Sequence, residues 1–335
     1  MPSIEKETKR TILVSVLGVT GQAERHIEHI NSSPHAKLHH VYHPDLSRIE
    51  RSKLKALPLT DVLEESSQSD AIIVASPTPA HFNQLQHLTN FNGHILVEKP
   101  VAENPTDLRR LLNFPNEWKS RVKVNFNFQA NPVGEKIRSI IQDGLIGEPI
   151  YGSFETNHGG AYKNNWANSW RASHINAGPL PTVGIHYIQW LVSIFGNPSN
   201  TSIQTMSAAK KSSDDSGIAQ LTWDSGFVTT IATSYASAFK IHFQISGTEG
   251  YVTYDGHSVK LFSPRDTFDE RGFFIQPPES LTFLSPWDIS YAQSIRNAQE
   301  AFMNTVIENA RYNPAEFDRD VQMTVNLMNS LSSGA

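Results

Sequence analysis

The stretch ILVSVLGVTGQA, residues 12–23, decides the fold of this chain. Residues 12–17 form a nearly continuous apolar run, which is typical of a strand that is buried on both faces of a sheet. A glycine turn follows and leads into a stretch of helical character; its residues are Gly18, Val19, Thr20, Gly21, Gln22 and Ala23. The turn is a modified G-x-G-x-x-G/A pattern, in which Thr20 takes the place of the second glycine. Alone, the pattern fits a dinucleotide-binding turn and an ordinary strand-to-helix turn equally well.

Four further apolar runs follow, separated by stretches of helical length. They are residues 38–42, 71–75, 94–97 and 122–128. Short buried strands joined by helices form a mainly parallel, doubly wound sheet. We therefore expect an α/β domain of this type over residues 1–124.

After residue 144 the pattern changes to longer strands with period-two alternation, so we expect a second α/β domain over residues 125–335. Residues 227–235 alternate strictly, and Asp224, Ser225 and Gly226 form a candidate hairpin turn before them. Other candidate strands are residues 151–156, 202–206, 218–223, 241–246, 251–254 and 259–262. Helices are expected near residues 133–142, 181–195 and 287–309. This pattern predicts a large, open, mostly antiparallel sheet.

The composition excludes several classes of protein. The 335 residues are enough for two domains, the net charge is −5, and the chain contains no cysteine. A net negative charge argues against nucleic acid or an anionic membrane as partner, and the lack of thiols excludes disulfides and thiolate chemistry. No apolar run has the length of a signal peptide or a membrane span, so we expect a soluble, cytoplasmic protein.

In an open parallel sheet, ligands bind at the carboxyl ends of the strands. At the end of the second predicted strand stands His43, where an acidic residue would favour NAD; His43 could meet a ribose hydroxyl or a 2′-phosphate, and Asp45 could also reach the ribose. The choice between NAD and NADP stays open, as does a plain strand end. The third strand leads into a loop and helix start with the cofactor-binding candidates Ser76, Pro77, Thr78 and His81.

Glu98, Lys99 and Pro100 follow the fourth strand. Two opposite charges directly after a buried strand are either a salt-bridged strand end or a functional pair, and as a functional pair Glu98 and Lys99 are cofactor-binding candidates. Six of the 14 histidines lie between His26 and His43, but their spacing does not suit a metal site, so we expect no metal.

A polar stripe runs along the helix expected over residues 181–195. Thr182, His186, Gln189 and Ser193 recur at helical spacing among apolar residues. Polar side chains on a buried helix must find partners or line a cavity. His186 is therefore either a candidate site residue or a satisfied core histidine.

Seven segments carry a resemblance to a known family. They are residues 18–26, 75–81 (ASPTPAH), 98–100 (EKP), 124–132 (VNFNFQANP), 144–149 (GLIGEP), 184–186 (GIH) and 245–250 (ISGTEG). In this order and spacing they resemble the glucose-fructose oxidoreductase, inositol dehydrogenase and MocA (Gfo/Idh/MocA) family of NAD(P)-dependent oxidoreductases. The resemblance implies an N-terminal Rossmann domain that binds NAD or NADP. It also implies an open C-terminal sheet that often forms an oligomer interface, and that Lys99 and His186 meet beside the nicotinamide.

Four residues depart from the family pattern: Thr20, His43, Gln129 and Thr182. Thr20 and His43 bear on how tightly the cofactor binds and on the choice between NAD and NADP. Thr182 stands where many members have an aspartate one turn before the histidine, which concerns how His186 is oriented.

Two hypotheses follow. The first is a dehydrogenase or reductase that moves hydride between nicotinamide and a secondary alcohol of a sugar, polyol or nucleotide-linked sugar, with Lys99, His186 and Thr182 as catalytic residues. Its substrate-binding candidates are Lys99, Asn127, Tyr162, Trp170, Arg171, Thr182 and His186. The alternative is a non-catalytic relative that binds a dinucleotide or a sugar. Either would assemble as a homodimer or homotetramer through the alternating strands.

Overall fold

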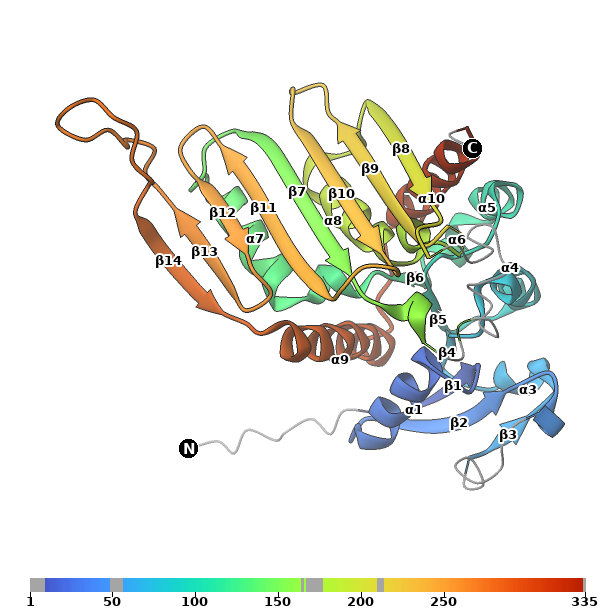
Figure 1. The fold of residues 1–335 in the computed structure, drawn as a ribbon. Helices are drawn as coiled ribbons and strands as arrows, with labels where there is room; N and C mark the ends of the chain where they lie inside the picture. The colour runs from blue at the N-terminus through green and yellow to red at the C-terminus, as the bar shows by residue number, and fades with distance from the viewer. Residues whose placement is uncertain (1–9, 49–56, 164–165, 167–176, 210–213, 334–335) are drawn as a thin grey trace, which may run out of the picture. The chain divides into compact units, whose positions relative to one another are not determined.

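The computed structural model describes residues 10–48, 57–163, 166, 177–209 and 214–333. The chain forms two compact units (Figure 1). The first unit contains Met1–Asn125 and Ala298–Gln322, and the second contains Phe126–Asn297 and Met323–Ala335. Each unit is built around one sheet, so the expected α/β class with two different sheets is confirmed.

The first unit contains a six-stranded parallel sheet with the order β3-β2-β1-β4-β5-β6. This is the strand order of the doubly wound dinucleotide-binding fold. The strands are β1 (Ile12–Leu17), β2 (Ala36–Tyr42), β3 (Leu59–Thr60), β4 (Ala71–Val74), β5 (His94–Glu98) and β6 (Val122–Asn125). Strands β4 and β5 are buried along their whole length, which explains their unbroken apolar sequence.

Helices pack against this sheet. They are α1 (Gln22–Ser32), α3 (Leu63–Ser66), α4 (Thr78–His87), α5 (Pro105–Leu112) and α6 (Asn116–Lys119). Helix α1 buries Ala23, Ile27 and Ile30 in the same cluster as β1, because these residues recur at helical spacing on one face. Phe302 and Met303, from the far end of the chain, complete that cluster.

The second unit contains an eight-stranded sheet with the order β14-β13-β12-β11-β7-β10-β9-β8. All neighbouring strands are antiparallel except β7 and β10. The strands are β7 (Pro149–Asn157), β8 (Asn200–Met206), β9 (Ser216–Thr222), β10 (Val228–Ser234), β11 (Lys240–Gly247), β12 (Tyr251–Tyr254), β13 (Ser258–Phe262) and β14 (Glu279–Leu284). The predicted hairpin turn is confirmed: the amide of Gly226 donates to Trp223 O at 2.9 Å, and Gly226 has φ 88°.

Helices α7 (Pro132–Gln142) and α8 (Ile185–Phe195) cover one face of this sheet (Figure 1). An aromatic cluster fills the space between them and the strands. Phe243 of β11 lies at its centre, with ring centroids 5.1 Å from Phe154 and Tyr187 and 5.7 Å from Phe128. These offset and edge-on contacts are the arrangements that aromatic rings prefer.

Two expected elements end or begin differently. The run 122–128 is a strand only as far as Asn125; Asn127–Ala130 is a 3-10 turn, because Asn131 caps α7 by accepting from Val133 N at 2.8 Å and the chain must bend to reach it. The helix expected over 181–195 begins with a π turn at Leu180–Gly184, where Pro181 has no amide hydrogen to donate.

The sequence did not predict β3, β14 or α10 (Pro314–Ser333), nor that α9 (Trp287–Ile307) would span the two units. The functional domains expected over residues 1–124 and 125–335 remain a prediction. The two units differ from them in that residues 298–322 pack with the first unit. Across the described residues, no helix has the length and apolar character that a membrane span requires.

The aromatic cluster generates a test of the second unit. Phe243 is fully buried, so Phe243→Ala should lower the free energy of unfolding by about 3–5 kcal/mol through lost burial and the cavity it leaves. Phe239, which is 67% exposed, provides the control: Phe239→Ala should change stability by no more than about 0.5 kcal/mol. Urea denaturation followed by tryptophan fluorescence measures both; equal effects would contradict the packing described.

Candidate functional site

The carboxyl ends of the strands in the first unit form one edge of its sheet. The register places Tyr42, Leu17, Val74, Val97 and Val124 side by side across five strands. The residues that follow them are therefore neighbours at this edge. They include the predicted cofactor-binding residues of the glycine turn, His43, the Ser76 loop, and Glu98 with Lys99.

The glycine turn packs closely against the backbone that follows β4. Gly18 has φ +119°, and a Cβ there would lie 2.7 Å from Ala75 O, so a side chain does not fit. Gly21, with φ +66° at the start of α1, has open space around it. The side chain of Thr20 is exposed. The positive end of α1, which has no side-chain cap, points to this open turn, which suits a pyrophosphate.

His43 follows β2 and is held by a short local contact. Its Nδ1 lies 2.8 Å from Asp45 O, and the Asp45 carboxylate accepts from Ser47 N at 3.0 Å. The carboxylate of Asp45 therefore caps the turn at Leu46–Arg48. Because Nδ1 of His43 contacts the backbone of Asp45, Nε2 is the ring nitrogen of His43 that a ribose could meet.

The loop after β4 is fixed by buried groups. Ser76 Oγ donates to Gln84 Oε1 at 2.6 Å, while Thr78 is buried and Pro77 is exposed. His81 is 1% exposed; its Nε2 lies 2.8 Å from Ser76 O and its Nδ1 2.9 Å from Pro100 O. Burial lowers the pKa of His81, against the two carbonyls and the Glu98 charge, which act in the opposite direction.

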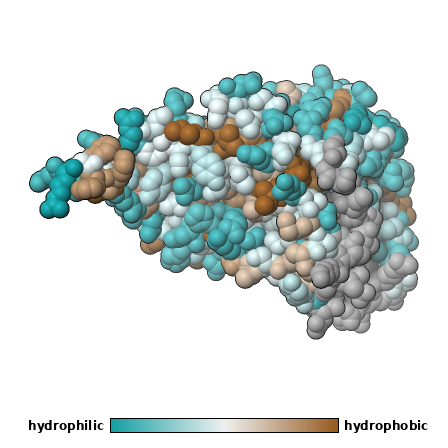
Figure 2. Space-filling model, turned by 45° about the horizontal axis from the view of Figure 1, so that its top comes forward, coloured by the Kyte–Doolittle hydropathy of each residue, from teal (hydrophilic) through white to brown (hydrophobic). Residues whose placement is uncertain are grey.

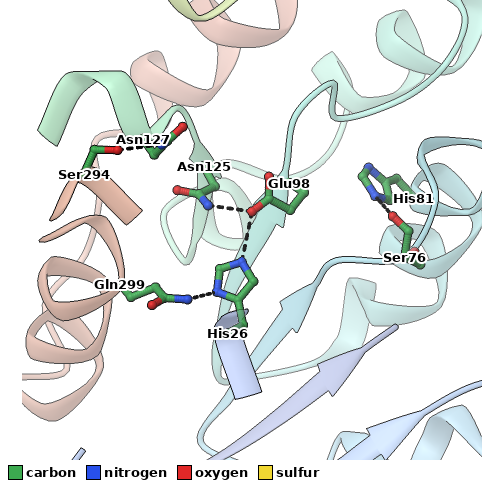
Figure 3. A network of polar contacts seen from close by, with 8 residues as sticks. All are labelled: His26, Ser76, His81, Glu98, Asn125, Asn127, Ser294 and Gln299. Carbon is green, nitrogen blue, oxygen red and sulfur yellow. Dashed lines mark hydrogen bonds and ion pairs between the residues drawn. The ribbon is translucent and has the colours of Figure 1, made fainter. Parts of the chain in front are cut away.

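Glu98, at the end of β5, is the centre of a buried polar network (Figure 3). His26 Nε2 lies 2.9 Å from Glu98 Oε1, and Asn125 Nδ2 donates to the same oxygen at 2.6 Å. The side-chain amide of Gln299 meets the other ring nitrogen of His26. Burial by itself would raise the pKa of Glu98, but the hydrogen bond and charge of His26, the charge of Lys99 and the Asn125 bond outweigh it and hold this pKa below its ordinary value.

Lys99 comes next in the chain and is half-buried. Its neighbours on either side, Glu98 and Pro100, both contact buried histidines, His26 and His81. The sequence did not predict that His26, Asn125 or Gln299 belong to the site. The apolar face of α1 includes His26 and could have signalled a buried histidine, whereas Gln299 lies 273 residues away in the chain.

The remaining predicted residues belong to the second unit. Thr182 Oγ1 donates to Gly178 O at 2.7 Å and also contacts the hydroxyl of Tyr235, which follows β10. His186 lies in the first turn of α8 and is half-buried. Its ring lies edge-on to that of Phe126, with the ring centroids 6.1 Å apart. Ser193, at the other end of the polar stripe, accepts from Arg138 at 3.0 Å, so Thr182 and Ser193 both have hydrogen-bond partners within this unit.

Asn127 donates to Ser294 Oγ at 2.8 Å and is buried, whereas Tyr162 is 62% exposed. Trp170 and Arg171 lie outside the described residues. Within the described ranges, no group of three or more His, Cys, Asp or Glu side chains could hold a metal ion.

Comparison with known proteins identifies the class. Residues 12–126 match the model "Oxidoreductase family, NAD-binding Rossmann fold", and residues 135–253 match the "GFO/IDH/MocA C-terminal domain". The two matches cover most of the chain. The chain belongs to the GFO/IDH/MocA family of oxidoreductases.

Individual relatives are distant. Inositol 2-dehydrogenase of Rhizobium meliloti is 28% identical over 88 residues, 26% of this chain and 27% of that protein. dTDP-3,4-didehydro-2,6-dideoxy-alpha-D-glucose 3-reductase of Actinomadura kijaniata is 22% identical over 278 residues, 82% of this chain and 79% of the reductase. The chain spans only 26–43% of the length of the first four curated relatives it matches.

Solved structures share the fold over nearly the whole chain. A levoglucosan dehydrogenase in complex with NADH and levoglucosan has a TM-score of 0.79 at 14% identity, covering 97% of this chain and 98% of that one.

The glycine turn generates a prediction on ligand binding. Gly18→Ala places a Cβ against Ala75 O in a backbone conformation that disfavours side chains, so the dissociation constant for NAD should rise by about tenfold or more, equal to about 1.4 kcal/mol. Gly144→Ala is the matched control, because Gly144 also has positive φ but open surroundings. Titration calorimetry on both folded variants measures the difference, and unchanged NAD binding by Gly18→Ala would remove this turn from the site.

Proposed function

We propose that this protein is an NAD-dependent dehydrogenase or reductase acting on a secondary alcohol of a sugar, polyol or nucleotide-linked sugar. The observation that carries the proposal is the position of Lys99. A lysine follows the buried carboxylate Glu98 at the same sheet edge as a glycine turn that admits no side chain at Gly18. Family membership supplies the reaction class.

The cofactor would be held by residues of the first unit. The turn from Gly18 to Ala23 would receive the pyrophosphate through backbone amides at the start of α1. His43 would meet the adenosine ribose, and Ser76 to Thr78 would line the groove. His81 and Glu98, whose contacts are internal, would support the site rather than touch the ligand.

The reaction transfers a hydride and a proton, and different groups handle each of them. Bound nicotinamide supplies the hydride acceptor or donor. In alcohol oxidation, His186 would accept the hydroxyl proton as the substrate gives up hydride and its alcohol becomes a carbonyl. Lys99 would bind the substrate oxygen and stabilise its developing negative charge. In carbonyl reduction the same groups act in reverse.

The remaining candidates would position the substrate. Tyr162, which is 62% exposed, would contact a sugar ring, and Arg171 with Trp170 would suit a phosphate or a ring face. Thr182 would act through the bonds it makes with Gly178 and Tyr235, which fix the turn before His186. The names of the relatives, an inositol dehydrogenase and a dTDP-sugar reductase, support a polyol or a nucleotide-linked sugar as the substrate.

The catalytic roles give a kinetic prediction. Lys99→Ala and His186→Ala should each lower turnover by a factor of about 10² or more, while NAD binding changes much less. Alcohol oxidation should rise with pH through a single ionisation between about 6 and 8, because a histidine must be neutral to accept a proton. The measurements are steady-state kinetics on a panel of inositols, sugars and sugar nucleotides, and calorimetry with NAD and NADP.

The outcomes separate the proposal from its alternative. A His186→Ala variant with near-normal turnover and an unmoved pH profile would mean that another group is the base. NAD or sugar binding without turnover on the whole panel would favour the non-catalytic relative.

We further propose that the protein is cytoplasmic and assembles as a homodimer or homotetramer through the eight-stranded sheet. On the face of this sheet away from its core, Tyr151, Tyr251 and Phe262 lie in one cross-strand row, and the rings of Tyr251 and Phe262 stack at 4.7 Å. Tyr151 is 46% exposed. Much of the surface in Figure 2 is polar or intermediate, with apolar side chains in separate patches, which suits an interface of mixed character.

Light scattering at micromolar concentration tests this assembly. The protein should have twice or four times the mass of one chain, and Tyr151→Glu should lower that mass, because a charge on the row must then be desolvated. Phe274→Ser, on the loop between β13 and β14, is the control: Phe274 is 85% exposed but lies off the strands. A wild-type monomer would refute the assembly.

A further inference from the structure

The residue that follows β5 is held from both sides by buried histidines. Lys99 lies between Glu98, which contacts His26, and Pro100, whose carbonyl contacts His81. Both histidines are 1% exposed, and they come from different helices, α1 and α4. Each histidine thus fixes one neighbour of Lys99 from inside the first unit.

We propose that His26 and His81 are positioning residues that hold Lys99 in the geometry its reaction requires. The proposal rests on the proposed function, because it takes Lys99 as the group that binds the substrate oxygen. Neither histidine is placed in contact with the substrate; both act through Lys99.

On one side, the support is a chain of four buried polar side chains. Gln299 contacts His26, His26 contacts Glu98, and Asn125 donates to the same carboxylate oxygen at 2.6 Å (Figure 3). Hydrogen bonds are stronger where water is excluded, and a carboxylate held by two partners has little freedom to rotate. The backbone of Glu98, and hence the start of Lys99, is fixed with it.

On the other side, the support joins two loops. The ring of His81 lies between Ser76 O at 2.8 Å and Pro100 O at 2.9 Å, so either nitrogen can donate to the carbonyl that it faces. Ser76 belongs to the loop that follows β4, and Pro100 to the segment that follows β5. The position of Lys99 is therefore tied to a loop expected to line the cofactor groove.

The charge at Glu98 adds a pH dependence. The titratable groups facing Glu98 are His26 from α1, His81 from α4 and Lys99 from its own segment. His26 makes the largest contribution that lowers the pKa of Glu98, so without its hydrogen bond and charge the opposing effect of burial raises this pKa. Glu98 then becomes neutral at a higher pH than in the wild type, and the support that its charge gives is lost below that pH.

The test uses amides that mimic one ring nitrogen each. A glutamine side chain can place its nitrogen near the position of histidine Nε2, and an asparagine near that of Nδ1. His26→Gln should keep the Glu98 contact and His26→Asn should lose it. For His81 the order reverses: His81→Asn should keep the Pro100 contact, and His81→Gln should lose it.

The direct readout is the rate at which acetic anhydride acetylates Lys99, measured by mass spectrometry relative to the exposed Lys37 of β2. We expect His26→Asn and His81→Gln to change this ratio severalfold and to lower turnover by about tenfold or more, the scale of a misplaced reacting group. His26→Gln and His81→Asn should stay near the wild type. His87→Asn, at the exposed end of α4, is the control. In His26→Asn, Glu98 should add a second ionisation to the acidic side of the pH profile of turnover, at pH values where circular dichroism shows the variant still folded.

The crossed pattern decides the inference. The inference would be overturned if folded His26→Asn and His81→Gln kept the wild-type ratio of Lys99 to Lys37 acetylation. It would also be overturned if the glutamine and asparagine variants of each histidine had equal effects. If His26→Asn gives no folded protein, Asn125→Leu, which removes the second donor to Glu98, takes its place with the same expectation. The labelling needs no substrate. If the variants show the expected acetylation of Lys99 but the wild type turns over no compound of the panel, the proposed function alone is refuted. If the wild type has turnover but the variants do not show the expected acetylation, this inference alone is refuted.

Discussion

A carboxylate that is kept ionised inside the protein is the constraint on which the site of the first unit depends. Glu98 is 7% exposed, and an unpaired charge at such a position would cost several kcal/mol. The chain meets this cost with His26 from α1 and Asn125 from β6, so the helix after the glycine turn and the last strand of the sheet are both fixed relative to β5. The glycine turn, through α1, and Lys99 are thus joined by one buried network.

Most of the fold follows from patterns that the sequence displays locally. Strand β1 and the strand β12 have the bounds that the sequence predicts, because buried runs and period-two alternation are visible within a few residues. Strand β3 is only two residues long, and β14 lies at the sheet edge, where its side chains are exposed or half-buried. Helix α10 buries Asp320 and Thr324 among its apolar residues, so its helical period is obscured.

The candidate site could be predicted in its positions but not in its contacts. The glycine turn, His43, Ser76 and Lys99 follow strand ends, and parallel strands bring such residues to one edge. The partner of a buried polar group, in contrast, is set by tertiary packing. Nothing near Glu98 in the chain indicates Gln299, and nothing near Thr182 indicates Tyr235, although the inward alternation of β10 places Tyr235 on the buried face. The roles of these residues in catalysis remain a prediction.

The first unit is discontinuous in the sequence, and this affects the order in which the chain can fold. Phe302, Met303 and Val306 belong to the same apolar cluster as β1 and α1, and Tyr312 N donates to Ser120 O at 2.8 Å. A ribosome that has made only the first 125 residues has therefore produced all six strands of the sheet but left its core open on one side. Because the missing side chains are synthesised after residues 126–297, the first 125 residues must wait, with apolar surface exposed, until most of the second unit has emerged.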